Sequence, residues 1–180
     1  MFDLCLNGKQ MFEYSFLHLN MPKPHFRCIY IFFLLISFSS KAQEVNLDSL
    51  WTVWNDKTQA DSCRLKAMKS IAWDGYLFTQ PDSAFYFAKK GYDFAESTKN
   101  KKYMASLLNT QGVSFYLKGN YEKALEYYSK SIAIKEEIGD KYGMGSSYYN
   151  IGVVYKEQGN YEKALEYLLK SKNTKQEINT

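Results

Sequence analysis

The feature that most constrains the fold of this chain is an internal repeat with a period of forty residues. Residues 119–140 (GNYEKALEYYSKSIAIKEEIGD) and 159–180 (GNYEKALEYLLKSKNTKQEINT) are identical at 14 of 22 positions, and the first nine matches are consecutive. A weaker copy begins at residue 79, and in it Ala84 corresponds to Ala124 and Ala164. A fixed period of this length indicates a stacked array, because one repeat buries its apolar side only against the next.

Each repeat divides into two helices. Asn or Asp recurs every twenty residues from Asn100 to Asn160, and glycine precedes three of these positions, at 119, 139 and 159. Glycine suits the left-handed residue that ends a helix, and Asn or Asp caps the helix that follows. The apolar residues between these marks have helical spacing. We therefore predict a helix over 46–58, then helix pairs at 61–78/81–98, 101–118/121–138 and 141–158/161–177, and no sheet.

Small and aromatic residues recur at fixed positions in the second and third pairs. They are Leu108, Gly112, Phe115, Gly119, Tyr121, Ala124 and Tyr128, and then Tyr148, Ile151, Gly152, Tyr155, Gly159, Tyr161 and Ala164. Gly and Ala at these positions would let partner helices approach closely, with aromatic rings filling the remaining gaps. The pattern resembles the tetratricopeptide repeat over residues 61–180. This resemblance implies an all-α fold, a right-handed α-solenoid of antiparallel helix pairs with units of about 61–100, 101–140 and 141–180.

The chain departs from the family pattern in three ways. Its period is 40 residues instead of 34, which predicts longer helices, as in the elongated forms of the family. The proline that normally closes the second helix is absent. In the first pair, Gly75 stands where an aromatic residue is expected.

The resemblance also implies a partner-binding groove, because the first helix of each pair lines the concave face in this family. The residues expected there are Lys66, Lys69, Trp73, Tyr76, Asn109, Val113, Tyr116, Tyr149, Asn150, Val153 and Lys156. Lys and Asn can hold a peptide backbone or a carboxylate, and the aromatic residues can anchor a partner. The alternative is that apolar members such as Trp73 and Val113 pack between helices. Lys89-Lys90 and Lys101-Lys102 are expected on solvated faces.

Residues 21–42 have the layout of a secretory signal peptide. Lys23 and Arg27 precede an apolar run over 28–38, and small residues allow cleavage after Ala42. The run is short for a membrane span, and an uncleaved anchor is the alternative. We expect a periplasmic or secreted protein in which residues 1–42 are an extension and signal peptide and residues 43–60 hold a leading helix. Either Met1 or Met21 is the true start, and Met21 is the hypothesis that explains the twenty residues before the positive region.

The remaining 138 residues exclude several kinds of chemistry. They contain no histidine, a single cysteine, Cys63, and a single arginine, Arg64. The chain therefore lacks an imidazole base, a thiolate metal site and an internal disulfide. No glycine-rich phosphate loop is present, and a net charge of +4 for the whole chain is too small for a nucleic-acid tail. We expect no enzymatic activity, no cofactor and no metal.

Two functions are compatible with this sequence. The first is an exported, non-catalytic interaction module that binds a peptide or partner protein in the concave groove. The second is the N-terminal sensor part of a bacterial envelope signalling protein, a histidine kinase or transcriptional regulator, whose membrane span and further domains would follow. The last helix is amphipathic, with Leu165, Leu168 and Leu169, and we expect no polar capping helix after it. This indicates either self-association or a fragment of a longer protein.

Overall fold

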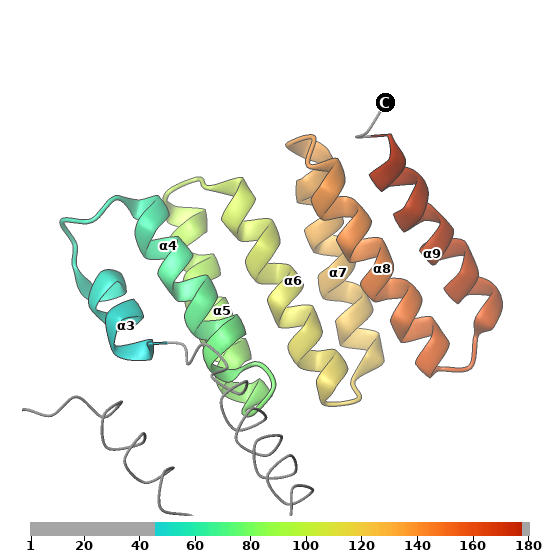
Figure 1. Cartoon of the computed structure of the whole chain (residues 1–180), viewed down its shortest axis with the longest axis horizontal. Coiled ribbons are helices and arrows are strands. Elements are labelled where there is room, and N and C mark those ends of the chain that lie inside the picture. The colour runs from blue at the N-terminus through green and yellow to red at the C-terminus, as the bar shows by residue number, and fades with distance from the viewer. Residues whose placement is uncertain (1–45, 178–180) are drawn as a thin grey trace, which may run out of the picture. The chain divides into compact units, whose positions relative to one another are not determined.

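The computed structural model describes residues 46–177, and every regular element among them is helical (Figure 1). The elements are α3 (Leu47–Asn55), α4 (Asp61–Ser70), the π-helix η1 (Ile71–Tyr76), α5 (Pro81–Ser97), α6 (Lys101–Leu117), α7 (Tyr121–Glu137), α8 (Lys141–Glu157) and α9 (Tyr161–Gln176). From α4 onward, successive helices run antiparallel and stand side by side in chain order. The predicted all-α solenoid is confirmed. The proposed signal peptide at 21–42, its cleavage site and both histidines lie outside the described residues.

Asparagine and aspartate cap the helices as the repeat predicts. The Asn120 side chain accepts from the Lys123 backbone N–H at 3.2 Å, and Asp140 accepts from the Gly143 N–H at 2.9 Å. The glycine before the cap has a left-handed backbone, with φ of +72° at Gly119. Lys99 occupies the equivalent position between α5 and α6, with φ of +54°. This left-handed conformation is unfavourable for any residue that carries a Cβ.

The small residues of the repeat bring the paired helices into close contact. A Cβ added at Gly112 would lie 2.6 Å from the Tyr128 ring and 3.3 Å from the Ala124 carbonyl oxygen. A Cβ at Gly152 would meet Leu168 at 2.9 Å in the same way. Ala124 is fully buried, so both partners of this contact must be small.

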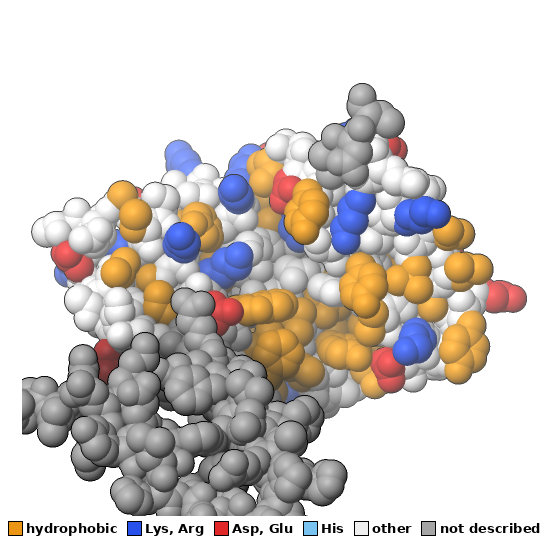
Figure 2. Space-filling view, in the orientation of Figure 1, with side chains coloured by type: hydrophobic (Ala, Val, Ile, Leu, Met, Phe, Trp, Pro, Cys, Tyr) orange, Lys and Arg blue, Asp and Glu red, His pale blue; other side chains and the backbone are white. Residues whose placement is uncertain are grey.

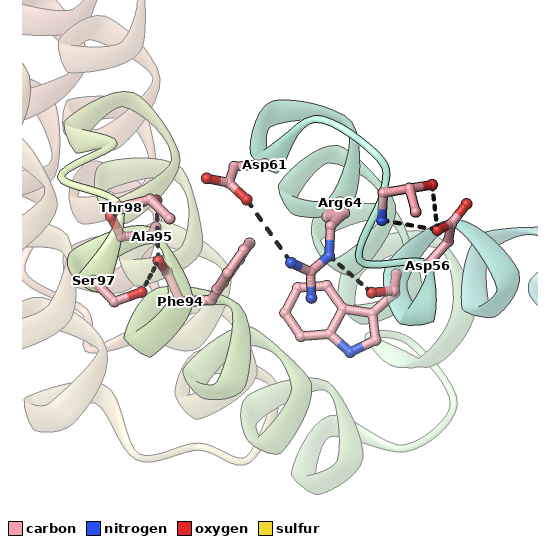
Figure 3. Close-up of polar contacts among 9 residues, drawn as sticks. Asp56, Asp61, Arg64, Phe94, Ala95, Ser97 and Thr98 are labelled. Atoms are coloured by element: carbon pink, nitrogen blue, oxygen red, sulfur yellow. Dashed lines mark hydrogen bonds and ion pairs between the residues drawn. The ribbon is translucent and has the colours of Figure 1, made fainter.

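Helix α3 closes the first end of the described array through Arg64 (Figure 3). The Arg64 guanidinium lies 4.4 Å from the Phe94 ring centre and 5.3 Å from that of Trp54. Its Nε donates to the Trp54 carbonyl oxygen at 3.1 Å. This one side chain therefore joins α3, α4 and α5 by cation–π contact and hydrogen bonding.

Two boundaries at this end differ from the prediction. The leading helix ends at Asn55 because the Asp56 carboxylate accepts from the backbone N–H and the hydroxyl of Thr58, which forms a turn (Figure 3). The helix expected over 61–78 changes at Ile71 into a π-helix. Gly75, in this segment, occupies the position where the family pattern has an aromatic residue. Leu47 of α3 fills the space of that ring, because a Cβ added at Gly75 would lie only 2.6 Å from the Leu47 side chain.

Candidate partner-binding groove

A hollow of about 540 Å³ opens between the first helices of the three pairs. Its lining comes from α4 and η1, from α6, from the end of α7 and from the start of α8: Lys69, Ser70, Trp73, Asp74, Lys102, Ser106, Asn109, Thr110, Lys135, Asp140, Tyr142, Gly143 and Ser146. Figure 2 shows this face with Lys and Arg side chains in its upper part and hydrophobic side chains gathered below them. A ligand on this face would meet both charged and aromatic groups.

Lys135 anchors a polar network at the hollow. Although it belongs to α7, the second helix of its pair, it is 5% exposed and reaches between the neighbouring helices. Its Nζ donates to Ser147 Oγ at 2.7 Å and to the Gly143 carbonyl oxygen at 3.1 Å. These two bonds fasten α7 to the first turns of α8.

The network continues to α6 through Asn109. The Asn109 Oδ1 accepts from Ser147 Oγ at 3.2 Å and from Asn150 Nδ2 at 3.1 Å. Two of the asparagines expected in the groove are therefore bonded to each other across α6 and α8. Their remaining amide N–H groups and lone pairs are what a partner could bind.

Burial lowers the pKa of the Lys135 ammonium to about 8, the like charge of Lys69 acts in the same direction, and the carboxylate of Asp140 opposes both. Lys135 is therefore charged at neutral pH and loses its proton in mildly alkaline solution. Together with Lys69 and Lys102, and against Asp74 and Asp140, it gives the lining a net charge of +1.

The structure brings three of the expected groove residues to the hollow: Lys69, Trp73 and Asn109. Val113 and Tyr116 are half-buried and pack against the core cluster that contains Phe115, so they belong to the contact between helices, as the alternative predicted for Val113. Asn150 and Val153 are half-buried on α8, and Lys66, Tyr149 and Lys156 are exposed. Tyr76 packs against Phe87 of α5 with ring centres 4.9 Å apart, so it belongs to the contact between helices. The Tyr116 hydroxyl has a raised pKa, because it is partly buried and lies near Glu157.

Sequence reasoning missed Lys135, Asp140, Tyr142 and Ser146, and it placed Lys102 on a solvated face. Lys102 is exposed, but it lines the hollow because α8 brings residues 142 and 146 opposite it. The burial of Lys135 could have been predicted from its position in the helical pattern of α7. Lys135 falls three and seven residues after Ile132 and Tyr128, on the buried side of α7.

The described residues show no constellation for metal chemistry. Between residues 46 and 177, no group of three His, Cys, Asp or Glu side chains lies close enough to hold an ion. None of the helices in that range combines the length and the apolar composition that crossing a membrane requires.

Comparison with known proteins agrees with this architecture. Residues 103–177, which form α6 to α9, match the family model described as tetratricopeptide repeat. No curated protein sequence matches the chain.

Solved structures extend the fold likeness beyond those residues. The TPR domain of FLU from Arabidopsis superposes with a TM-score of 0.56 at 22% identity, over 62% of this chain and 94% of that one. BtubC (BKLC) from P. vanneervenii has a TM-score of 0.50 at 14% identity, over 77% of this chain and 74% of that one. The chain is therefore similar to tetratricopeptide-repeat proteins in sequence over residues 103–177 and in fold over a wider part of the array.

Proposed function

We propose that this chain is an exported, non-catalytic interaction module that binds an extended segment of a partner protein along α4, η1, α6 and α8. The observation that carries the proposal is the hollow on this face, where the network of Lys135, Ser147 and Asn109 lies beside exposed lysines and an aromatic side chain. Its volume of about 540 Å³ falls in the usual range of ligand sites.

The chemistry of the lining favours a peptide over a cofactor. Lys69 and Lys102 are exposed, and neither forms an ion pair within the described residues. Ammonium groups without a counter-ion attract carboxylates, and asparagine side chains bind peptide groups as both donor and acceptor. Trp73, half-buried at the edge of η1, offers an apolar surface for a neighbouring side chain of the partner.

Selection of peptides from a random library on the immobilised full chain tests this function. Peptides that bind should carry at least one carboxylate. The double variant Lys69→Glu with Lys102→Glu should weaken them about tenfold or more, because it replaces attraction by repulsion at both sides of the hollow.

The matched control changes the same number of charges away from the hollow. Lys57 and Lys99 are both exposed, and the double variant Lys57→Glu with Lys99→Glu should leave the affinity unchanged within about twofold. Failure to select any peptide, or equal losses in the two double variants, would contradict the proposed groove.

Export is a separate part of the proposal and depends on residues 21–42. A fusion of residues 1–45 to a reporter enzyme that is active only outside the cytoplasm should show activity. The same fusion with Leu34→Arg and Leu35→Arg, which interrupt the apolar run, should be inactive. An inactive parent fusion would contradict export and leave the groove proposal intact.

A further inference from the structure

Helix α9 carries a stripe of exposed apolar side chains that α8 does not cover. Tyr161, Leu165 and Leu169 follow one another at intervals of four residues and are 71%, 59% and 48% exposed. Ala164 and Ser171, on a neighbouring side of the helix, are buried against α8. Exposed apolar side chains in a row are typical of an interaction surface, and Figure 2 shows hydrophobic side chains at the end of the array where Figure 1 places α9.

The equivalent side of α7, forty residues earlier, shows what a following helix pair covers. Tyr121 and Leu125 are half-buried and Ile132 is buried, in one cluster with Ile151 and Val154 of α8. The α9 residues at these positions include Lys172 in place of Ile132. A further pair stacked like α8 would cover this ammonium, which is unfavourable unless the added helix supplies acceptors, as α8 does for Lys135 with Ser147 and Gly143.

At residue 169 the substitution relative to α7 is from polar to apolar, whereas at residue 172 it is from apolar to charged. The counterpart of Leu169, Ser129, is exposed even though α8 follows α7, so this position lies outside the ordinary contact between repeats. A leucine at 169 therefore has no role in extending the array. The apolar surface of α9 is shifted toward residues 161–169 and fits a different neighbour.

The other end of the described array offers no complementary surface. Helix α3 packs Leu47, Leu50, Trp51 and Trp54 inward. Its exposed residues are polar: Asp48, Ser49, Thr52 and Asn55. A head-to-tail contact would place apolar α9 against this polar face, so the structure disfavours an open chain of copies.

The charges of α9 complement a second α9 that runs in the opposite direction. Most charges of α9 are engaged within the chain: Lys170 pairs with Glu166 at 2.7 Å, Lys163 lies over the Tyr155 ring, and Lys175 lies against Tyr142 of α8. This leaves Glu162 near the start of the helix and Lys172 near its end. Antiparallel pairing places Glu162 of each helix beside Lys172 of the other, whereas parallel pairing would place like charges together.

We propose that the chain forms a two-fold homodimer through antiparallel α9 helices. Leu165 of each copy packs on Leu169 of the other. Glu162 lies at the same level as Lys172 of the second copy, within reach of that flexible side chain, and neither residue forms an ion pair inside the described part of one chain. This inference concerns a surface separate from the groove and does not depend on the proposed peptide-binding function.

Sedimentation equilibrium of the full chain tests the interface. The wild type should change from monomer to dimer over about 1 to 100 µM. The double variant Leu165→Glu with Leu169→Glu should weaken dimerisation about 100-fold, because it removes the apolar contact and adds like charges. Both positions are half-exposed, so this variant should keep the wild-type circular dichroism. The control Tyr86→Glu introduces the same acidic residue at an exposed hydrophobic position on α5 and should leave the dimer unchanged.

A mixing experiment fixes the direction of the helices. Glu162→Lys and Lys172→Glu should each weaken the homodimer about tenfold, since each places like charges opposite one another at two symmetric points. An equimolar mixture of these two variants restores both opposite-charge pairs and should form heterodimers with wild-type affinity. A wild type that stays monomeric over this range, a leucine double variant that still dimerises, or single charge variants that do not recover on mixing would overturn the proposal.

Discussion

Replacing Lys135 by methionine should stabilise the protein at neutral pH and remove a specific dependence of stability on pH. The side chain is 5% exposed, and its folded pKa is about 8 against an ordinary value of 10.5. This difference corresponds to a cost of about 3 kcal/mol for burying the ammonium. Methionine fills a similar volume without charge but loses the bonds to Ser147 and Gly143, worth about 1 to 2 kcal/mol together. The expected net gain near neutral pH is about 1 to 2 kcal/mol.

The sign of the pH dependence follows from which state holds the proton. Below pH 8, Lys135 is charged in both states, and the folded protein carries the full cost of burial. As the pH rises toward 10.5, the folded state loses its proton first, so the free energy of unfolding increases. By about pH 9.5 the wild type should have gained about 2 kcal/mol relative to its value at pH 8. Burial also raises the pKa of the Tyr128 hydroxyl, which lowers stability at still higher pH, so the measurement stops there.

Urea unfolding followed by far-UV circular dichroism measures this difference. Wild type and Lys135→Met should be compared at the same pH values, because the titration of every other group then cancels between them. The advantage of the methionine variant should shrink by about 2 kcal/mol between about pH 8 and pH 9.5. Two stability curves that run parallel over this range would show that Lys135 does not titrate as its burial implies.

Three further substitutions test the packing. Lys99→Gly should raise the free energy of unfolding by about 1 kcal/mol because it removes a left-handed backbone strain, whereas Lys99→Ala should give no gain; equal effects in urea melts would refute the explanation. Gly112→Ala should destabilise by about 1 to 3 kcal/mol, since the new methyl meets the buried Tyr128 ring, and an unchanged melting temperature would contradict this contact. Arg64→Met should destabilise by about 1 to 2 kcal/mol and red-shift tryptophan fluorescence as Trp54 becomes exposed; an unaltered emission spectrum would show that α3 stays docked without the guanidinium.

The elements were predictable where local chemistry decides them. Asn120 and Gly119 mark their helix boundary through bonds and backbone angles within a few residues, and the structure places α7 there. The end of α3 also depends on local bonds. It was not predicted, because the Asp56 side chain forms the turn by accepting from the Thr58 backbone N–H, and the spacing of apolar residues carries no information on such a bond. The π-helix at Ile71 has no separate sequence signal, because the apolar spacing alone does not distinguish it from a continuing α-helix.

The lining of the hollow was only partly predictable, for a different reason. Lys69, Trp73 and Asn109 lie on first helices, where the repeat pattern directs attention. Lys135 lies on a second helix, and a lysine is ordinarily assigned to solvent. Its true environment depends on Ser147, a residue on the next helix that supplies the acceptor. Such a contact appears only when two helices are packed together.

Comparison with the preceding repeat shows that this contact is not needed for packing the helices. Forty residues before Lys135 and Ser147 stand Ala95 and Leu107, which are fully buried in one apolar cluster between α5 and α6. The same junction therefore packs as Ala with Leu in one place and as a buried Lys with Ser in the next, although the apolar version costs no desolvation of charge. The α5–α6 junction shows that helices of this repeat pack without a lysine at this position. What the polar version adds is an ammonium group held at the wall of the hollow, so the difference between the two junctions supports a binding role for this face more directly than the features that the repeats share.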